Sequence, residues 1–366
     1  MTRLPANEAR VAVLSGDGVG PEVTHEAVRA LRAAATRAGL GLTLEHGLLG
    51  GAAIEETGVP LPDDTLALCE ASDALLVGAV GGPRWDGLPA DRNPGPGGLL
   101  RLRRDLDLFA NLRPASTLVP EASPLRVPTV DILLVREAVG GLYFSPERGR
   151  RRDGSTEIGW DTMSYTAEQV RRIAVVAFEL AAAREGRLAS VDKANVLESS
   201  RLWRDVVDEV ASDFPQVTLD HLYVDNCAMQ LVLRPQDFDV IVTENLFGDV
   251  LSDELAGLVG SLGLLPSGSL RSDRFGLYEP VHGSAPDIAG TGAVNPAAAI
   301  LSAAMMLRHS LGHDSAAADI ERAVASVLRR GTRTPDLAGA GPAVSTSSFG
   351  DAVVAEIERH PAAEAS

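Results

Sequence analysis

The sequence predicts an α/β protein in which mostly parallel strands are covered by helices. Strand and helix patterns alternate along most of the chain, which is typical of this class. The composition, 45% hydrophobic and 23% charged, is that of an ordinary globular protein. At about 150 residues per domain, 366 residues indicate two domains.

The first strand and helix show the pattern clearly. Val11 to Leu14 is an apolar run, a glycine-rich turn follows at 16–20, and Pro21 opens a helix with apolar residues at helical spacing. Further strands are expected at 74–77, 130–135, 187–191, 217–224 and 240–242. Helices are expected at 63–70, 166–183, 200–212, 246–259, 296–310, 315–330 and 349–359.

Two stretches interrupt this alternation. Residues 81–98 form a long loop rich in glycine and proline, and loops of that length are usually functional. Residues 147–159 are polar and carry Arg148 and Arg150 to Arg152. We interpret the second stretch as a solvated arm or hairpin tip in preference to an anion site.

Net charge and cysteine content narrow the function and the compartment. The formal charge of −17 argues against a general binder of nucleic acid or anionic membrane, because the averaged field repels polyanions. The two cysteines, Cys69 and Cys227, are far apart and form neither a disulfide framework nor a metal-ligand spacing. With no apolar run long enough to span a membrane, we expect a cytoplasmic protein.

Three arginines stand in apolar or tightly turned surroundings. They are Arg103, Arg113 and Arg136, the last at the carboxyl end of a predicted strand, where α/β proteins bind ligands. Three guanidinium groups in one site would suit a substrate with more than one carboxylate, although each alone could be a structural ion pair.

The acidic candidates are spaced for a metal ion. Asp249 and Asp253 are four residues apart, so both project from one face of a helix, and Asp225 follows a predicted strand. Hard oxygen ligands of this kind suit Mg²⁺ or Mn²⁺, whereas a solvated helix face is the alternative.

Other residues could take part in proton transfer or cofactor binding. Lys193 at a strand end could act as a base, and Tyr143 after Gly140-Gly141 could donate a proton or be a core tyrosine. The irregular segment Glu279 to Asp287 could wrap a nucleotide or be an ordinary loop. The turn at 16–21 does not fit the Rossmann fingerprint, because Pro21 stands where a third glycine is needed.

Taken together, these segments resemble the 3-isopropylmalate dehydrogenases, within the β-decarboxylating dehydrogenases that also include isocitrate, homoisocitrate and tartrate enzymes. The motifs run in family order over nearly the whole chain. They are GDGVGPEV at 16–23, LFANLRP at 108–114, VREAVGGLYF at 135–144, SVDKANVLE at 190–198, YVDNCAMQLV at 223–232, TENLFGDVLSDE at 243–254, GSLGLLPSGSL at 260–270 and EPVHGSAPDIAGTGAVNP at 279–296.

The resemblance implies a metal-dependent, NAD-linked oxidation of a 2-hydroxy acid with loss of the β-carboxylate. Arg103, Arg113 and Arg136 match the substrate-carboxylate arginines. Asp249 and Asp253 match metal ligands of one subunit, and Asp225 matches the ligand from its partner. Lys193, also from the partner, matches the base on the 2-hydroxyl, and Tyr143 the acid that protonates the enol carbon. The resemblance therefore implies a homodimer with composite active sites.

For the cofactor, the resemblance implies NAD. Asp287 matches an acid that binds the ribose hydroxyls and would repel a 2′-phosphate. The remaining cofactor-binding residues implied in this segment are Glu279, His282, Gly283, Ser284, Ala285 and Asn295. The resemblance also implies a discontinuous cofactor-binding lobe at 1–109 and 260–366. The substrate, metal and dimerisation lobe would be 110–259, with an arm around 140–165.

One motif departs from the family pattern. The usual Glu-Thr-Gly before the apolar pair is replaced by Pro96-Gly97-Gly98, whereas Leu99 and Leu100 remain to meet an alkyl group at C3 of the substrate. Isopropylmalate is the substrate we expect, with Asp91 or another loop residue replacing the glutamate. The alternatives are a paralogue for a different 3-substituted malate, of homoisocitrate or tartrate type, and a non-catalytic regulatory subunit.

Overall fold

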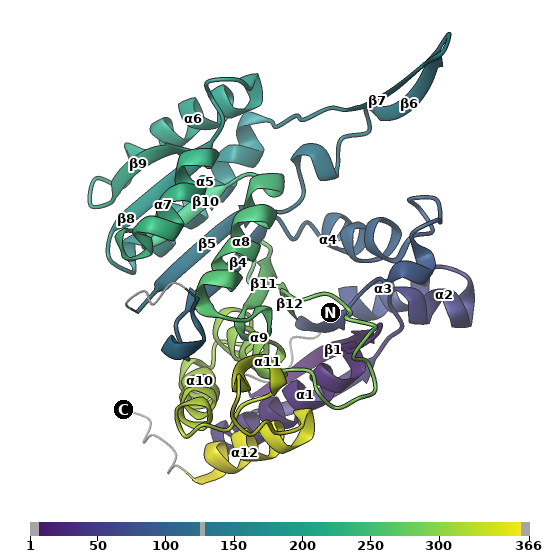
Figure 1. Ribbon diagram of the computed structural model, residues 1–366, viewed down its shortest axis with the longest axis vertical. Helices are drawn as coiled ribbons and strands as arrows, with labels where there is room; N and C mark the ends of the chain where they lie inside the picture. The colour runs from purple at the N-terminus through teal and green to yellow at the C-terminus, as the bar shows by residue number, and fades with distance from the viewer. Residues whose placement is uncertain (1–6, 125–128, 360–366) are drawn as a thin grey trace. The chain divides into compact units, whose positions relative to one another are not determined.

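The computed structural model describes residues 7–124 and 129–359. By their contacts the residues divide into two units (Figure 1). Unit 1 comprises Met1–Leu108, Leu118–Pro124 and Val259–Ser366, and unit 2 comprises Phe109–Thr117 and Leu125–Leu258. In this division the short segment 118–124 belongs to unit 1.

Unit 1 contains five strands that come from both ends of the chain. β1 (Glu8–Gly16) lies between the parallel strands β2 (Gly41–His46) and β3 (Ala74–Ala79). On its other side β3 pairs in parallel with β12 (Gly276–Pro280), which pairs antiparallel with β11 (Pro266–Leu270). Segments about 200 residues apart in sequence are thus neighbours in one sheet.

Four long helices of unit 1 pack on one another: α1 (Gly20–Ala38), α9 (Ala297–His309), α10 (Asp314–Arg329) and α12 (Thr346–Arg359). The amphipathic pattern of α1 explains its packing, since Val23, Ala27, Ala30 and Leu31 are all fully buried. Shorter helices are α2 (Gly51–Thr57), α3 (Asp63–Glu70), α4 (Arg101–Asp105), α11 (Pro335–Ala338), the π-helix η2 (Pro94–Leu100) and the 3₁₀ turns η1 (Pro83–Trp85), η3 (Pro120–Ala122) and η6 (Leu262–Leu264).

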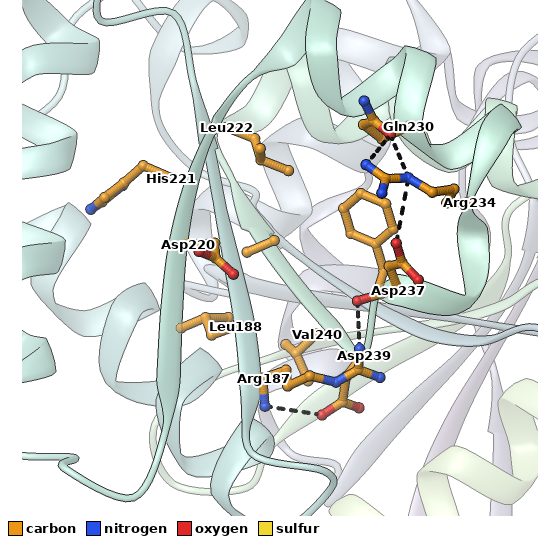
Figure 2. A pocket seen from close by; sticks show the side chains of 12 residues that line it. Arg187, Leu188, Asp220, His221, Leu222, Gln230, Arg234, Asp237, Asp239 and Val240 are labelled. Atoms are coloured by element: carbon orange, nitrogen blue, oxygen red, sulfur yellow. Dashed lines mark hydrogen bonds and ion pairs between the residues drawn. The ribbon is translucent and has the colours of Figure 1, made fainter.

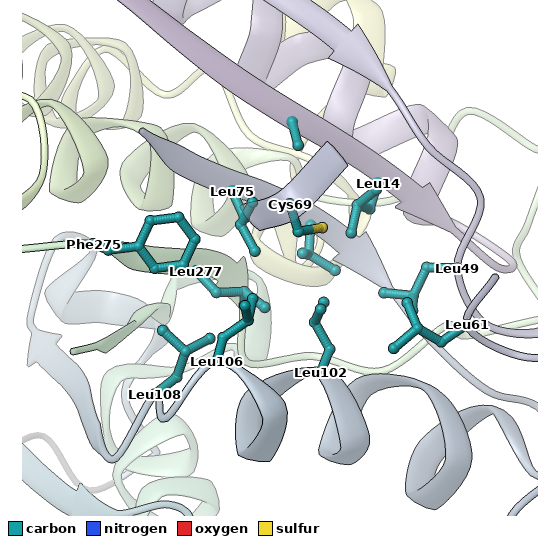
Figure 3. Packing of buried hydrophobic residues seen from close by; sticks show 12 residues of the cluster. Leu14, Leu49, Leu61, Cys69, Leu75, Leu102, Leu106, Leu108, Phe275 and Leu277 are labelled. Atoms are coloured by element: carbon teal, nitrogen blue, oxygen red, sulfur yellow. The ribbon is translucent and has the colours of Figure 1, made fainter. Parts of the chain in front are cut away.

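A hydrophobic cluster joins both halves of unit 1. Leu14 of β1, Leu75 of β3 and Leu277 of β12 meet Leu102 of α4 in it, all of them fully buried (Figure 3). Burying a leucine side chain contributes about 1.5–3 kcal/mol, so this cluster alone binds the terminal third of the chain firmly to the first. Leu99 packs half-buried against the same cluster.

Unit 2 also has a five-stranded sheet. β5 (Asp131–Glu137) pairs antiparallel with β4 (Ala110–Ser116) and parallel with β10 (Val240–Thr243). The parallel strands β8 (Arg187–Asp192) and β9 (Thr218–Tyr223) complete it. Its helices are α5 (Ala167–Ala182), α6 (Glu198–Ala211), α7 (Val224–Leu233) and α8 (Asn245–Val259), with 3₁₀ turns η4 (Gly141–Tyr143) and η5 (Pro235–Asp237).

The basic stretch of the sequence is a separate hairpin. β6 (Arg148–Asp153) and β7 (Thr156–Asp161) pair only with each other among the described strands, and they project from the rest of unit 2 (Figure 1). The prediction of a solvated arm or hairpin is therefore confirmed. The predicted helices and strands all form, whereas β2, β4, β11, β12, α2, α4, α7 and α11 were not predicted, and two antiparallel pairs modify the parallel sheet.

Candidate active site

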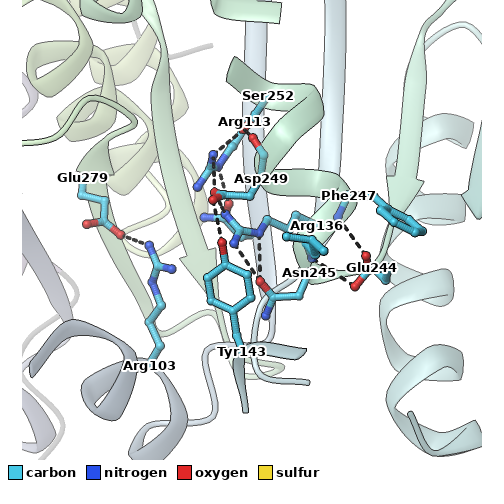
Figure 4. A network of polar contacts seen from close by, with 12 residues as sticks. Arg103, Arg113, Arg136, Tyr143, Glu244, Asn245, Phe247, Asp249, Ser252 and Glu279 are labelled. Carbon is cyan, nitrogen blue, oxygen red and sulfur yellow. Dashed lines mark hydrogen bonds and ion pairs between the residues drawn. The ribbon is translucent and has the colours of Figure 1, made fainter. Parts of the chain in front are cut away.

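In unit 2, three side chains from three elements meet at one carboxylate. Tyr143 at the end of η4 donates a hydrogen bond of 2.8 Å to Oδ2 of Asp249 (Figure 4). Arg136 at the end of β5 donates from Nη1 to Oδ1 of the same carboxylate, and Nη1 of Arg113 lies 3.5 Å from that oxygen. The structure thus places four predicted residues of this unit in one cluster.

Amide side chains hold both arginines of this cluster. Nε and Nη2 of Arg136 donate to Oδ1 of Asn245 over 3.2 and 2.7 Å, and Nε of Arg113 donates to Oδ1 of Asn111 over 2.7 Å. Both guanidinium groups are buried. Two buried cations would suit a dicarboxylate ligand, since buried charges require paired partners.

Asp249 and Asp253 lie one turn apart on α8, as predicted. Burial raises the pKa of Asp253, and the negative charge of Asp249 raises it further. A divalent cation between these carboxylates would relieve that repulsion, so the oxygen donors fit a hard metal ion such as Mg²⁺ or Mn²⁺. In the part of the chain that the structure describes, no three His, Cys, Asp or Glu side chains gather as a metal cluster. A metal ion bound to these two carboxylates would therefore need further ligands from other groups.

The environment of Tyr143 keeps its hydroxyl protonated. Burial raises the pKa of Tyr143, and the hydrogen bond to Asp249 raises it further. The guanidinium of Arg136 lies 5.3 Å from the centre of the tyrosine ring. A phenol that stays protonated has a proton to donate to a substrate atom.

Lys193 and Asp225 form a second cluster in unit 2. Lys193 follows β8, its Nζ pairs with Oδ1 of Asp225 in the first turn of α7, and its backbone N–H donates to Oγ of Ser200 over 3.1 Å. The hydrogen bond from Lys193 lowers the pKa of Asp225, which therefore stays ionised as a metal ligand must.

In unit 1, Arg103 forms a buried ion pair that the sequence did not predict. Its Nη2 lies 2.5 Å from Oε1 of Glu279 at the end of β12 (Figure 4), and the two side chains are 8% and 7% exposed. Nε of Arg103 has no hydrogen-bond partner in the described residues. Residues predicted separately for substrate and cofactor therefore lie side by side.

The glycine-rich turn after β1 packs against the predicted nucleotide segment. The N–H of Val19 donates to the carbonyl of Ser284 over 2.8 Å. Gly18 has φ +57°, and a Cβ there would lie 2.0 Å from that carbonyl oxygen, so only glycine fits. Asp17 accepts the N–H groups of Gly51 and Ala52, both over 2.8 Å, and so caps α2.

The other predicted cofactor residues differ in their surroundings. Nδ1 of His282 lies 2.9 Å from the carbonyl of Gly283, and burial lowers its pKa, which favours the neutral ring. Asp287 is exposed in a turn, and Ala285 has a strained φ of +36°. The side-chain oxygen of Asn295 accepts the N–H of Ala297, in the first turn of α9, over 3.0 Å, and its Nδ2 donates to Oδ2 of Asp336 over 3.0 Å. Its side chain is therefore engaged structurally.

The loop in which Pro96-Gly97-Gly98 replaces the usual family motif is closely packed. Leu99 and Leu100 are half-buried in η2, and a Cβ at Gly97 would lie 2.3 Å from the backbone carbonyl of Asp91. Asn93 caps the segment by accepting the N–H of Gly95 over 3.0 Å. Asp91 itself is exposed.

A cavity of about 240 Å³ lies elsewhere in unit 2 (Figure 2). The cavity is lined by Arg187 and Val240, the first residues of β8 and β10, so it adjoins the amino ends of these strands. The candidate site residues follow the carboxyl ends of the same strands. Within its lining, Arg234 donates to Gln230 over 2.9 Å and lies 3.5 Å from Asp237. No predicted site residue lines it.

Comparison with known proteins identifies the family to which the chain belongs. A family profile described as isocitrate/isopropylmalate dehydrogenase matches residues 10–353. The chain belongs to this family. The resemblance seen in the motifs and the α/β fold are therefore both confirmed, and the chain is a dehydrogenase of this family.

Relatives and solved structures agree with this assignment. The chain is 55% identical over 357 residues to the 3-isopropylmalate dehydrogenase of Halalkalibacterium halodurans, covering 96% of this chain and 98% of the relative. It is 56% identical to that of Hahella chejuensis, covering 94% and 97%. The isocitrate dehydrogenase structure from Methylococcus capsulatus has a TM-score of 0.87 at 36% identity, covering 96% and 100%. Among the described residues, no helix is long and apolar enough to cross a membrane.

Proposed function

We propose that the protein catalyses the NAD-dependent oxidative decarboxylation of (2R,3S)-3-isopropylmalate to 4-methyl-2-oxopentanoate and CO₂, a step of leucine biosynthesis. The observation that carries this proposal is the cluster of Tyr143, Arg136 and Asp249, which combines a proton donor, a carboxylate-binding cation and a metal ligand. The curated relatives at more than 50% identity support the substrate.

In this mechanism Arg103, Arg113 and Arg136 bind the substrate carboxylates. Lys193 removes the proton of the 2-hydroxyl while the hydrogen at C2 leaves as a hydride, for which NAD⁺ held by the segment of His282 and Ser284 would be the acceptor. The new 2-oxo group then accepts the electron pair of the bond to the β-carboxylate, which leaves as CO₂. The resulting enolate returns to the ketone as C3 takes a proton from Tyr143. The phenolate then regains a proton from solvent, to which Lys193 releases the one that it removed from the 2-hydroxyl, so the protons balance.

We assign the metal to Asp249 and Asp253 of one chain with Asp225 of a second copy. The mutual repulsion of the first two carboxylates supports this assignment, since a cation between them would relieve it. Bound there, Mg²⁺ or Mn²⁺ would polarise the 2-hydroxyl and a carboxylate oxygen.

Exposed apolar side chains support a homodimer. Met229, Val232 and Leu233 of α7 are 50%, 42% and 63% exposed, and Val250 of α8 is 60% exposed. Exposed apolar helix faces are what a protein interface would cover. Lys193 and Asp225 would then reach the active site of the other chain.

We assign NAD to the segment that includes His282, Gly283, Ser284 and Ala285, with Glu279 and Asn295 at its ends. Asp287 supports NAD over NADP, because its exposed carboxylate can accept bonds from ribose hydroxyls and repels a phosphate. The free, buried thiols of Cys69 and Cys227 support a location in the reducing cytoplasm.

A second substrate is favoured by one observation. The family glutamate of the loop is Pro96 here, and a Cβ at the neighbouring Gly97 would lie 2.3 Å from the backbone carbonyl of Asp91, so this loop is too tightly packed for a side chain at position 97. A paralogue that acts on another 3-substituted malate is therefore the alternative, with Leu99 and Leu100 still favouring an alkyl group. A non-catalytic subunit is disfavoured by the intact residues Tyr143 and Lys193.

A spectrophotometric assay tests the function. Purified protein with Mg²⁺ or Mn²⁺ is given NAD or NADP and each of isopropylmalate, isocitrate, homoisocitrate, tartrate and malate. We expect NADH formation to be fastest with isopropylmalate. A higher kcat/KM with another malate would establish the paralogue, and no reduction with any substrate would refute the catalytic proposal.

A further inference from the structure

We propose that Asn245 is a positioning residue that fixes both the loop of Tyr143 and the guanidinium of Arg136. Asn245 is the first residue of α8 and is 1% exposed. It bonds to two segments that carry candidate catalytic or binding groups. The inference deepens the proposed function, because Tyr143 and Arg136 act in that reaction.

The side-chain amide of Asn245 uses its two ends for different tasks. Oδ1 accepts from Nε and Nη2 of Arg136 over 3.2 and 2.7 Å (Figure 4). Nδ2 donates to the carbonyl of Gly140 over 3.2 Å. The oxygen fixes the plane of the guanidinium and leaves Nη1 directed at Asp249. The nitrogen holds the loop that leads to Tyr143.

The backbone of Asn245 is itself held by buried groups. Its N–H donates to the hydroxyl of Tyr165 over 3.0 Å, and that hydroxyl donates to Oε2 of Glu244 over 3.2 Å. Glu244 also accepts the N–H groups of Leu246 and Phe247 over 3.0 and 2.8 Å. These bonds fix the start of α8, and with it the position from which the side-chain amide of Asn245 reaches the loop of Gly140 and Tyr143.

The loop fits closely onto the same tyrosine. Gly141 has φ +67°, and a Cβ there would lie 2.4 Å from the hydroxyl oxygen of Tyr165. The N–H of Gly140 donates to Oε2 of Glu137 over 2.8 Å. Contacts on both sides leave the two glycines little freedom, so the position of Tyr143 depends on them and on Asn245.

Two substitutions of Asn245 separate its roles. Asn245→Asp keeps an oxygen for Arg136 but replaces the donor to Gly140 with an oxygen that repels its carbonyl. We expect kcat to fall about 10- to 100-fold with KM for isopropylmalate within about threefold, because catalysis by a displaced acid weakens while carboxylate binding is kept. Asn245→Ala removes both bonds, and we expect KM to rise as well.

The control is a matched pair of hydroxyl deletions. Tyr165→Phe removes the hydroxyl that holds Asn245, and Thr243→Val removes a buried hydroxyl that donates to the carbonyl of Val191 over 2.9 Å. Each loss costs a buried hydrogen bond, so both variants should show lower Tm. We expect only Tyr165→Phe to lower kcat at a temperature where both are folded.

A double-mutant cycle separates positioning from general stability. In a Tyr143→Phe background, Asn245→Asp should lower kcat by less than about threefold, since the group it positions is already gone. Additive losses in kcat, or wild-type kcat in Asn245→Asp, would overturn the proposal.

A spectroscopic readout keeps the test independent of turnover. The chain has four tyrosines, Tyr143, Tyr165, Tyr223 and Tyr278, so fluorotyrosine-labelled protein gives a simple ¹⁹F spectrum assigned by Tyr→Phe variants. We expect Asn245→Asp to shift and broaden the Tyr143 resonance and leave Tyr278 unchanged. An unchanged Tyr143 resonance would refute the positioning role, whereas an inactive wild type with the expected shift would refute only the proposed function.

Discussion

Tyr143 and Asp249 share one hydrogen bond, 2.8 Å long, between a proton donor and a proposed metal ligand. The phenol proton of Tyr143 therefore points at the carboxylate of Asp249 for as long as this hydrogen bond is kept. A cation bound to Asp249 would weaken that carboxylate as an acceptor and so leave the phenol available to a substrate carbon.

Removing the phenol tests this arrangement. We expect Tyr143→Phe to lower kcat about 10²- to 10³-fold with little change in KM or Tm, because a half-buried hydroxyl is lost while the arginines stay in place. Steady-state kinetics and a thermal melt measure both effects. Near-normal kcat would exclude Tyr143 as the acid.

The buried pair in unit 1 predicts a strong stability effect. Arg103→Met leaves Glu279 as an uncompensated buried charge, and we expect the free energy of unfolding to fall by about 3–5 kcal/mol. Arg103→Met combined with Glu279→Gln should recover most of that loss. Urea unfolding of both single variants and the double variant measures the coupling. Additive losses would show that the two side chains stabilise the fold independently.

Glu137 predicts a pH dependence of stability. Burial raises its pKa to about 7, from 4.5, against the opposing bonds from the N–H groups of Val139 and Gly140. Between these values the folded state binds a proton that the unfolded state has lost, so the free energy of unfolding falls as pH rises. Relative to Glu137→Gln, the wild type should lose up to roughly 3 kcal/mol across this window.

Urea unfolding at pH 4.5, 6 and 7.5 measures that difference. Glu179→Gln, on the exposed side of α5, is the matched control for loss of one carboxylate. Parallel pH profiles for the wild type and Glu137→Gln would contradict the prediction.

Mixed dimers test the composite site. A heterodimer of Lys193→Ala and Asp253→Asn subunits contains one site with both native groups if Lys193 acts across the dimer. We expect about half the wild-type kcat, whereas either variant homodimer is nearly inactive. Co-expression with two affinity tags gives the mixed species.

The reverse combination makes this test decisive. A subunit that carries both substitutions, paired with a wild-type subunit, should be nearly inactive, because each site then lacks one group. The opposite result, half activity here and almost none in the first heterodimer, would place Lys193 in the site of its own chain.

Cofactor preference depends on Asp287 in the proposal. We expect Asp287→Ala to raise KM for NAD about tenfold, the loss of roughly one hydrogen bond, and to narrow the preference over NADP. The exposed side chain predicts an unchanged Tm. Glu358→Ala on α12, also exposed, controls for the loss of surface charge. Wild-type KM values in Asp287→Ala would reject the assignment.

Strands such as β3 and β10 could be predicted because each is an apolar run without a charged residue, and the structure buries every residue of both. β4 could not, because Asn111, Arg113 and Pro114 interrupt its apolar pattern. Asn111 and Arg113 bond each other in the candidate site. β11 and β12 are five residues each and rich in small or polar side chains, so their strand character comes from pairing with distant segments.

Charged site residues could be predicted by motif and spacing, but their partners could not. Glu279 is far from Arg103 in sequence, and the fold alone brings them together. Asn245 looks like an ordinary polar residue between a strand and a helix. Its bonds to Arg136 and Gly140 depend on three elements whose packing no local pattern encodes.

The position of β3 between β1 and β12 has a consequence for synthesis. The ribosome completes β3 about 200 residues before β12 emerges, which at 5–20 residues per second is roughly 10 to 40 s. During that time one apolar edge of β3 is unpaired, while the strands of unit 2 are being made. In this interval, before the carboxyl-terminal third arrives, the nascent chain exposes a strand edge with which other segments could pair.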